Sequence, residues 1–131
     1  MDNRDIVNHL DREFAELINS LKELVRSVPS DDVLRSAAVM EQTFGGLTAN
    51  LWDDPFEWTL PETLSNAELI IEYLSEVDLA RQRAFNSILD DNALTKYISV
   101  PSGEPRQLVS LLLETLIAAA DFRGRARSGL P

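Results

Sequence analysis

The sequence of 131 residues contains no cysteine, one histidine and no long run of apolar residues. The absence of cysteine excludes disulfide bonds, thiolate metal sites and a cysteine nucleophile. No segment approaches the roughly 20 apolar residues that a membrane-spanning helix needs, and none near the start has the pattern of a signal peptide. These absences predict a soluble, cytoplasmic protein without a membrane partner.

Motifs that carry chemistry are also missing. The single histidine, His9, is the only imidazole base available to a serine nucleophile, and no Gly-x-Ser-x-Gly motif, P-loop or dinucleotide fingerprint occurs. We interpret His9 as a surface residue that lies near Glu13 across one helical turn. The sequence therefore leans against an enzyme without excluding one.

The charge balance argues against a nucleic-acid partner. The 22 acidic and 12 basic residues give a formal net charge of -10, which repels a phosphate backbone. The local exception is the group Arg123, Arg125 and Arg127. Arginines at the end of a helix complement its dipole, so we predict no binding of nucleic acid.

Helical periodicity is the main positive signal. Apolar residues recur at spacings of three and four over residues 2–28, 32–51, 65–89 and 105–125. Pro29 ends the first segment, Ser65 and Glu68 form a capping box for the third, and Pro105 suits the first turn of the fourth. No segment indicates a strand. The pattern predicts an all-α four-helix bundle with one domain over residues 1–131.

A long connection is predicted between the second and third helices, over residues 52–64. It contains two prolines and three large aromatic residues, namely Trp52, Phe56 and Trp58. Two interpretations stay open. The aromatic side chains cover one end of the bundle, or they form the lid of a pocket for a small molecule.

The last helical segment resembles the end of a DinB-like (YfiT-type) four-helix bundle. Residues 118–125 read AAADFRGR, where that family usually has His-x-x-x-His-Arg-Gly-Gln. Glu41, the run LETL at 113–116 and the helix order add to the resemblance. It implies a bundle with a long second connection and a metal held by three imidazoles. The ligand positions map to Ser36 (or Met40 with a shift in register), Ala118 and Phe122.

None of these residues replaces an imidazole, so we predict a metal site that has been lost, with no metal and no cofactor. Ala118 and Phe122 share a stripe with Leu108, Leu111 and Thr115, which predicts that both face the interior. Phenylalanine is large enough to fill the space that a ligand and a metal leave. The expected function is that of a metal-free binding or interaction protein, and the dimers frequent in the family imply a homodimer.

Two alternatives remain. One is an enzyme, a metal- or thiol-dependent transferase or hydrolase with an unconventional carboxylate site formed by Glu41, Glu114 and His9. Glu41 and Glu114 are expected near the inner edges of the second and fourth helices, where carboxylates more often point to solvent. The other is a small-molecule binder under the aromatic lid. The sequence indicates no specific substrate, partner or pathway.

Overall fold

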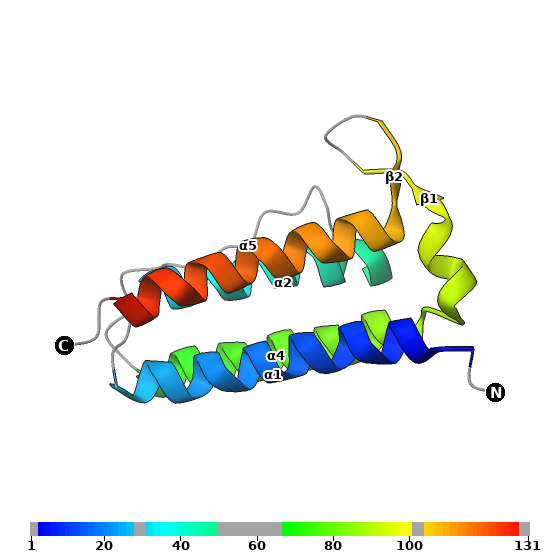
Figure 1. Cartoon of the computed structure of the whole chain (residues 1–131). Coiled ribbons are helices and arrows are strands. Elements are labelled where there is room, and N and C mark those ends of the chain that lie inside the picture. The colour runs from blue at the N-terminus through cyan, green and yellow to red at the C-terminus, as the bar shows by residue number, and fades with distance from the viewer. Residues whose placement is uncertain (1–2, 28–30, 50–66, 101–103, 129–131) are drawn as a thin grey trace.

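The computed structural model describes residues 3–27, 31–49, 67–100 and 104–128. Its helices are α1 (Asp5–Ser27), α2 (Asp31–Ala49), α4 (Ala67–Asn86) and α5 (Leu108–Ser128). A 3₁₀ helix, η2 (Asp91–Thr95), and two strands, β1 (Tyr97–Ile98) and β2 (Arg106–Gln107), join α4 to α5. The predicted all-α four-helix fold is confirmed (Figure 1), and residues 50–66 separate the second helix from the third.

The start of the fourth helix differs from the prediction. Pro105 precedes β2, and α5 begins only at Leu108. The chain first forms an antiparallel strand pair in which Tyr97 faces Gln107, and the Leu108 amide donates to the Lys96 carbonyl at 2.9 Å. Strands of two residues are too short to produce a visible alternation in the sequence. At its other end α5 continues past Gly124.

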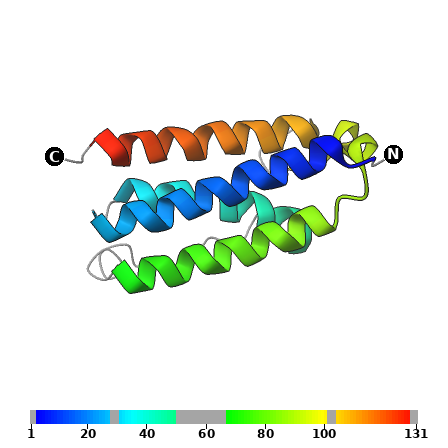
Figure 2. The same ribbon diagram turned by 60° about the horizontal axis from the view of Figure 1, so that its bottom comes forward.

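The four helices form a bundle in which α1 lies diagonally across from α2. Helices α1 and α5 run in one direction, and α2 and α4 run in the opposite direction (Figure 1). Helix α5 packs mainly on α2, while α4 packs on both α1 and α2. Helix α1 touches α5 more lightly and α2 least of all. The first two helices are therefore diagonal neighbours. Helices α1 and α5 lie side by side (Figure 2), but they pack less extensively than the other neighbouring helices.

Three phenylalanines form the centre of the core. Phe14 of α1 meets Phe44 of α2 edge-on, with ring centroids 5.1 Å apart and planes at 81°. Phe85 of α4 lies 5.9 Å from Phe14 and 6.1 Å from Phe44. All three side chains are buried. Aromatic pairs in this geometry add to the energy of apolar burial, so this cluster joins three of the four helices.

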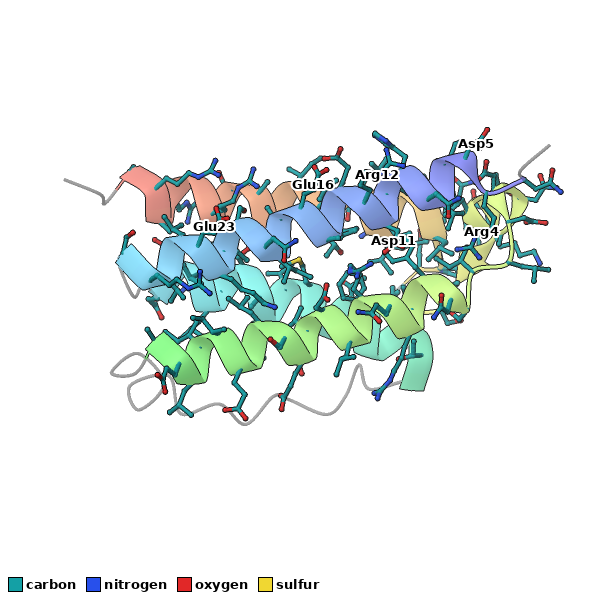
Figure 3. The ribbon with its side chains drawn as sticks, turned by 90° about the horizontal axis from the view of Figure 1, so that it is seen from below. Arg4, Asp5, Asp11, Arg12, Glu16 and Glu23 are labelled. Atoms are coloured by element: carbon teal, nitrogen blue, oxygen red, sulfur yellow. The ribbon has the colours of Figure 1, made fainter. Side chains whose placement is uncertain are left out.

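A buried ion-pair group links α1 to α4. Arg81 of α4 is 9% exposed; it pairs with Asp11 of α1 and, at 2.9 Å, with Asp78 one turn away. Figure 3 shows Asp11 on the side of α1 that faces α4. Removal of one partner from such a group leaves a poorly solvated charge, so these residues fix how α1 lies against α4.

Asp91 of η2 caps the start of α1, and Arg4, just before α1, caps the end of α4. Asp91 accepts hydrogen bonds from the amides of Ile6 and Val7 at 3.2 and 3.0 Å. Arg4 donates in return to the carbonyls of Phe85 and Ile88 at 3.2 and 2.8 Å. Free amides at a helix start and free carbonyls at a helix end need such partners. Residues more than 80 positions apart thus satisfy both ends.

No helix in the described part of the chain is long and apolar enough to cross a membrane.

Candidate functional site

Ser36 lies in the seam between α2 and α5. Its side chain has no exposed surface, and its hydroxyl donates to the Ala119 carbonyl at 2.7 Å. Farther along the same seam, about two turns past Ser36 on α2, the hydroxyls of Thr43 and Thr115 hydrogen-bond each other at 2.7 Å. Buried polar groups need such partners. The seam is therefore held by neutral hydroxyl groups that are already satisfied within the protein.

Ala118 and Phe122 do not face the interior as fully as predicted. Both are half-buried, and the buried residues of α5 are Leu108, Leu112, Thr115, Ala119 and Ala126. Ala118 and Phe122 follow Thr115 by one and two turns, so they lie at the edge of this stripe, on the side of α2. The guanidinium of Arg125 lies over the Phe122 ring, 5.3 Å from its centroid. The buried stripe of α5 therefore includes Ala119, in place of the predicted Ala118 and Phe122.

The three residues of the alternative metal site lie in different environments. Glu41 faces α4, where Tyr73 lies near its carboxyl group. Glu114 is exposed and pairs with Arg106 of β2. His9 is exposed on α1, with its Nε2 atom 3.8 Å from Glu13. Within the four described segments, no three histidine, aspartate or glutamate residues are close enough together to hold a metal ion.

Glu41 is the residue with the most perturbed carboxyl group. Burial raises its pKa from 4.5 to about 7; the nearby Tyr73 hydroxyl lowers the pKa, and the nearby charge of Glu76 raises it. Its Oε2 atom is buried and has no hydrogen-bond partner among the described residues. Burial and the neighbouring carboxylates also raise the pKa of Tyr73. A carboxyl group that titrates near neutral pH is suited to proton transfer and marks a candidate functional residue.

A shallow polar pocket lies beside the strand pair and was not predicted. Its volume is about 480 Å³, and it opens widely to solvent. Its walls include Tyr97, Glu104, Arg106, Gln107, Ser110 and Glu114. The Arg106–Glu114 ion pair lies in these walls, and Glu104 adds a further carboxylate. The pocket forms only because β2 turns the chain into α5, and no sequence motif marks such a turn.

The aromatic residues of the predicted lid, Trp52, Phe56 and Trp58, lie outside the described residues. The lid therefore stays a prediction.

Comparison with known proteins gives no relative that would assign a role to these residues. No protein-family model matches the chain, and no curated protein and no solved structure shows significant similarity to it. The DinB-like resemblance therefore remains a prediction that rests on the residues quoted above.

Proposed function

We propose that this chain is a DinB-like bundle that works as a binding or interaction protein and not through the metal of that family. One observation carries the proposal: the Ser36 hydroxyl, at a ligand position, is buried and bonded to the backbone of α5. A hydroxyl in this role holds two helices together. Ala118 and Phe122, at the other two positions, offer no lone pair to a metal.

The proposal predicts that purified protein binds no zinc or nickel tightly, and that three imidazoles restore binding. The variant Ser36→His/Ala118→His/Phe122→His places histidines on adjacent faces of α2 and α5. If the positions correspond to the family site, this variant binds about one zinc ion per chain with a Kd in or below the micromolar range. Isothermal titration with zinc, together with metal analysis of the purified protein, measures both.

A matched control moves one histidine away from the seam. Ser36→His/Ala118→His/Asp121→His has the same number of imidazoles, but position 121 is exposed on α5, so tight binding is not expected. One stoichiometric tightly bound zinc or nickel ion in the wild-type protein would overturn the metal-free proposal. Equal zinc affinity of the two triple variants would remove the support for the DinB-like register.

Glu41 favours a second candidate function, an enzyme that uses this carboxyl group in acid–base catalysis. The group is half-buried, lies beside Tyr73 and titrates near pH 7. Screening for hydrolysis of activated esters and thiol conjugates tests this function. Glu41→Gln is then expected to abolish turnover and His9→Ala to preserve it. Turnover that is unchanged in Glu41→Gln would exclude the candidate. Cytoplasmic location and small-molecule binding stay predictions.

A further inference from the structure

The strand pair lies at the end of the bundle where α5 begins (Figure 1), and the pocket of about 480 Å³ lies beside it. Tyr97 of β1 and Gln107 of β2, which face each other across the strand pair, both line this pocket. Ser110 and Glu114 line it from the first two turns of α5, and Glu104 precedes β2. The volume is within the range of small-ligand sites in proteins.

Hydrogen bonds hold the backbone that carries these side chains. The Leu108 amide donates to the Lys96 carbonyl at 2.9 Å, and the Nε2 atom of Gln107 donates to the Thr95 carbonyl at 3.2 Å. Before β1, the buried side chain of Leu94 anchors η2 in the core. Side chains that are held in place before a ligand arrives lose less entropy on binding, so this pocket is suited to a ligand.

The described residues of the pocket walls carry one net negative charge. Glu104 and Glu114 contribute two carboxylates, and Arg106 contributes one guanidinium group. Residues 101–103, outside the described segments, contain no charged side chain. The neighbouring Lys96 is exposed and does not line the pocket. In a chain of net charge -10, such walls repel an anion and attract a ligand with a positive charge.

The two carboxylates of the walls differ in their partners. Glu114 forms an ion pair with Arg106, and the hydrogen bond between them lowers the pKa of Glu114 and raises the pKa of Arg106. Each of these two groups therefore keeps the other charged. Glu104 is exposed and has no ion pair or hydrogen bond with another described residue. Its carboxylate is the one in these walls that is left to pair with a ligand.

Tyr97 adds an aromatic face to the pocket, because its side chain is 69% exposed. The face of an aromatic ring attracts cations, and a guanidinium group also stacks on it with its flat side. A guanidinium group can further donate two parallel hydrogen bonds to one carboxylate, which an ammonium group cannot do in this geometry. A ring and a carboxylate in the walls of one pocket therefore suit an alkylguanidinium ion.

Other classes of ligand fit these walls less well. An apolar molecule would remove water from carboxylates and a guanidinium group without replacing their hydrogen bonds. A metal ion needs several ligand atoms close together, and no three histidine, aspartate or glutamate residues within 3–27, 31–49, 67–100 and 104–128 provide them. The charge of the walls favours an organic cation over a neutral polar molecule.

We propose that this pocket binds an alkylguanidinium group, which is the end of an arginine side chain and also occurs in free small molecules. The cation stacks on the Tyr97 ring and pairs with the Glu104 carboxylate, while Glu114 stays paired with Arg106. This inference rests on the proposed function as a binding protein and specifies the chemistry of its ligand.

A titration followed by NMR spectroscopy of the backbone amides tests the site, with N-acetyl-arginine amide as the probe. The control compound is N-acetyl-citrulline amide, in which a neutral urea group of the same shape replaces the guanidinium group. Because the pocket is open to solvent, we expect a Kd of about 1–10 mM for the arginine probe at low salt. The citrulline compound is expected to bind about fivefold more weakly or less. The largest shifts are expected at Tyr97, Gln107 and Ser110.

Two variants and a matched control separate this site from the general attraction of an acidic protein for cations. Glu104→Gln removes the pairing carboxylate, and Tyr97→Leu removes the ring. Each is expected to weaken binding of the arginine probe by about threefold or more. Glu72→Gln makes the same change in charge at an exposed position of α4 outside the pocket walls, so it is expected to bind like the wild type. Circular dichroism checks the helical content of each variant.

A comparison with free L-arginine distinguishes the two sources of the group. Tighter binding of N-acetyl-arginine amide supports an arginine side chain within a peptide, because free arginine brings its α-carboxylate toward Glu104 and Glu114. Tighter binding of free arginine supports a small molecule as the ligand of the same site.

Four results would overturn the inference. They are no binding of the arginine probe at about 20 mM, equal affinity for the citrulline compound, equal effects of Glu104→Gln and Glu72→Gln, and shifts that spread over α1 and α4. None of them alters the zinc titrations of the seam between α2 and α5, so a failure of this inference is distinguishable from a failure of the proposed function.

Discussion

Replacement of Phe14 by alanine is expected to lower the free energy of unfolding by about 3–5 kcal/mol. Phe14 has no exposed surface and contacts the rings of both Phe44 and Phe85. These rings come from α2 and α4, and a cavity at this point would be lined from three helices that hold each other in place. Because these helices hold each other in place, they cannot move in to fill the cavity. We therefore expect the loss of unfolding free energy to lie toward the upper end of this range. Urea unfolding followed by circular dichroism measures it.

Phe122→Ala is the matched control for Phe14→Ala and bears on the candidate site. Its side chain is half-buried at the edge of α5. We therefore expect a loss of less than about 2 kcal/mol, mostly from the reduced burial of apolar area. Equal losses of unfolding free energy in Phe14→Ala and Phe122→Ala would show that Phe122 belongs to the interior. The family's ligand position would then be a core position, as the sequence predicted.

Glu41→Gln is expected to make the protein more stable above pH 7 and to leave it nearly unchanged at pH 5. The folded-state pKa of Glu41 is raised from 4.5 to about 7. Between these values the unfolded chain loses its proton while the folded chain keeps it, so the carboxyl group lowers stability as pH rises. Above about pH 7 the penalty is complete and constant. Glutamine cannot ionise and avoids it.

The size of this effect is limited by solvent. One pKa unit corresponds to about 1.4 kcal/mol, and partial exposure of Glu41 reduces the total to roughly 1–2 kcal/mol at pH 8. Urea unfolding at pH 5, 6, 7 and 8 gives the difference between variant and wild type. Glu72→Gln, an exposed position on α4, corrects for the change in net charge. A difference that does not vary with pH would show that Glu41 is solvated like a surface carboxylate.

The helices could be predicted because burial is periodic along them. The stripe from Val7 to Val25 in α1 has the regular spacing of a helix with one buried face. The prediction of α5 was less accurate in detail. Apolar residues surround much of this helix, among them the exposed Leu113 and Ile117, so its sequence does not distinguish the side that packs on α2 from the side that faces outward. This ambiguity led to the assignment of Ala118 and Phe122 to the interior.

The candidate site was less predictable than the fold. The sequence placed Glu41, Glu114 and His9 together as acidic or basic groups near helix edges, but a helix edge does not specify the neighbouring helix. Glu41 faces Tyr73 of α4 and Glu114 faces Arg106 of β2. The perturbed pKa of Glu41 depends on Tyr73 and Glu76, which are more than 30 positions away in the chain. Such an environment arises from tertiary packing, and no local motif encodes it.

The diagonal placement of α1 and α2 has a consequence for how the chain folds. In a bundle whose consecutive helices are neighbours, each helical hairpin can form early through local contacts. Here α1 packs chiefly on α4, and α5 packs chiefly on α2, so the main helix pairs close long segments of chain. Closing these segments costs entropy before the contacts repay it. We expect this chain to fold more slowly than an up-and-down bundle of the same length and stability.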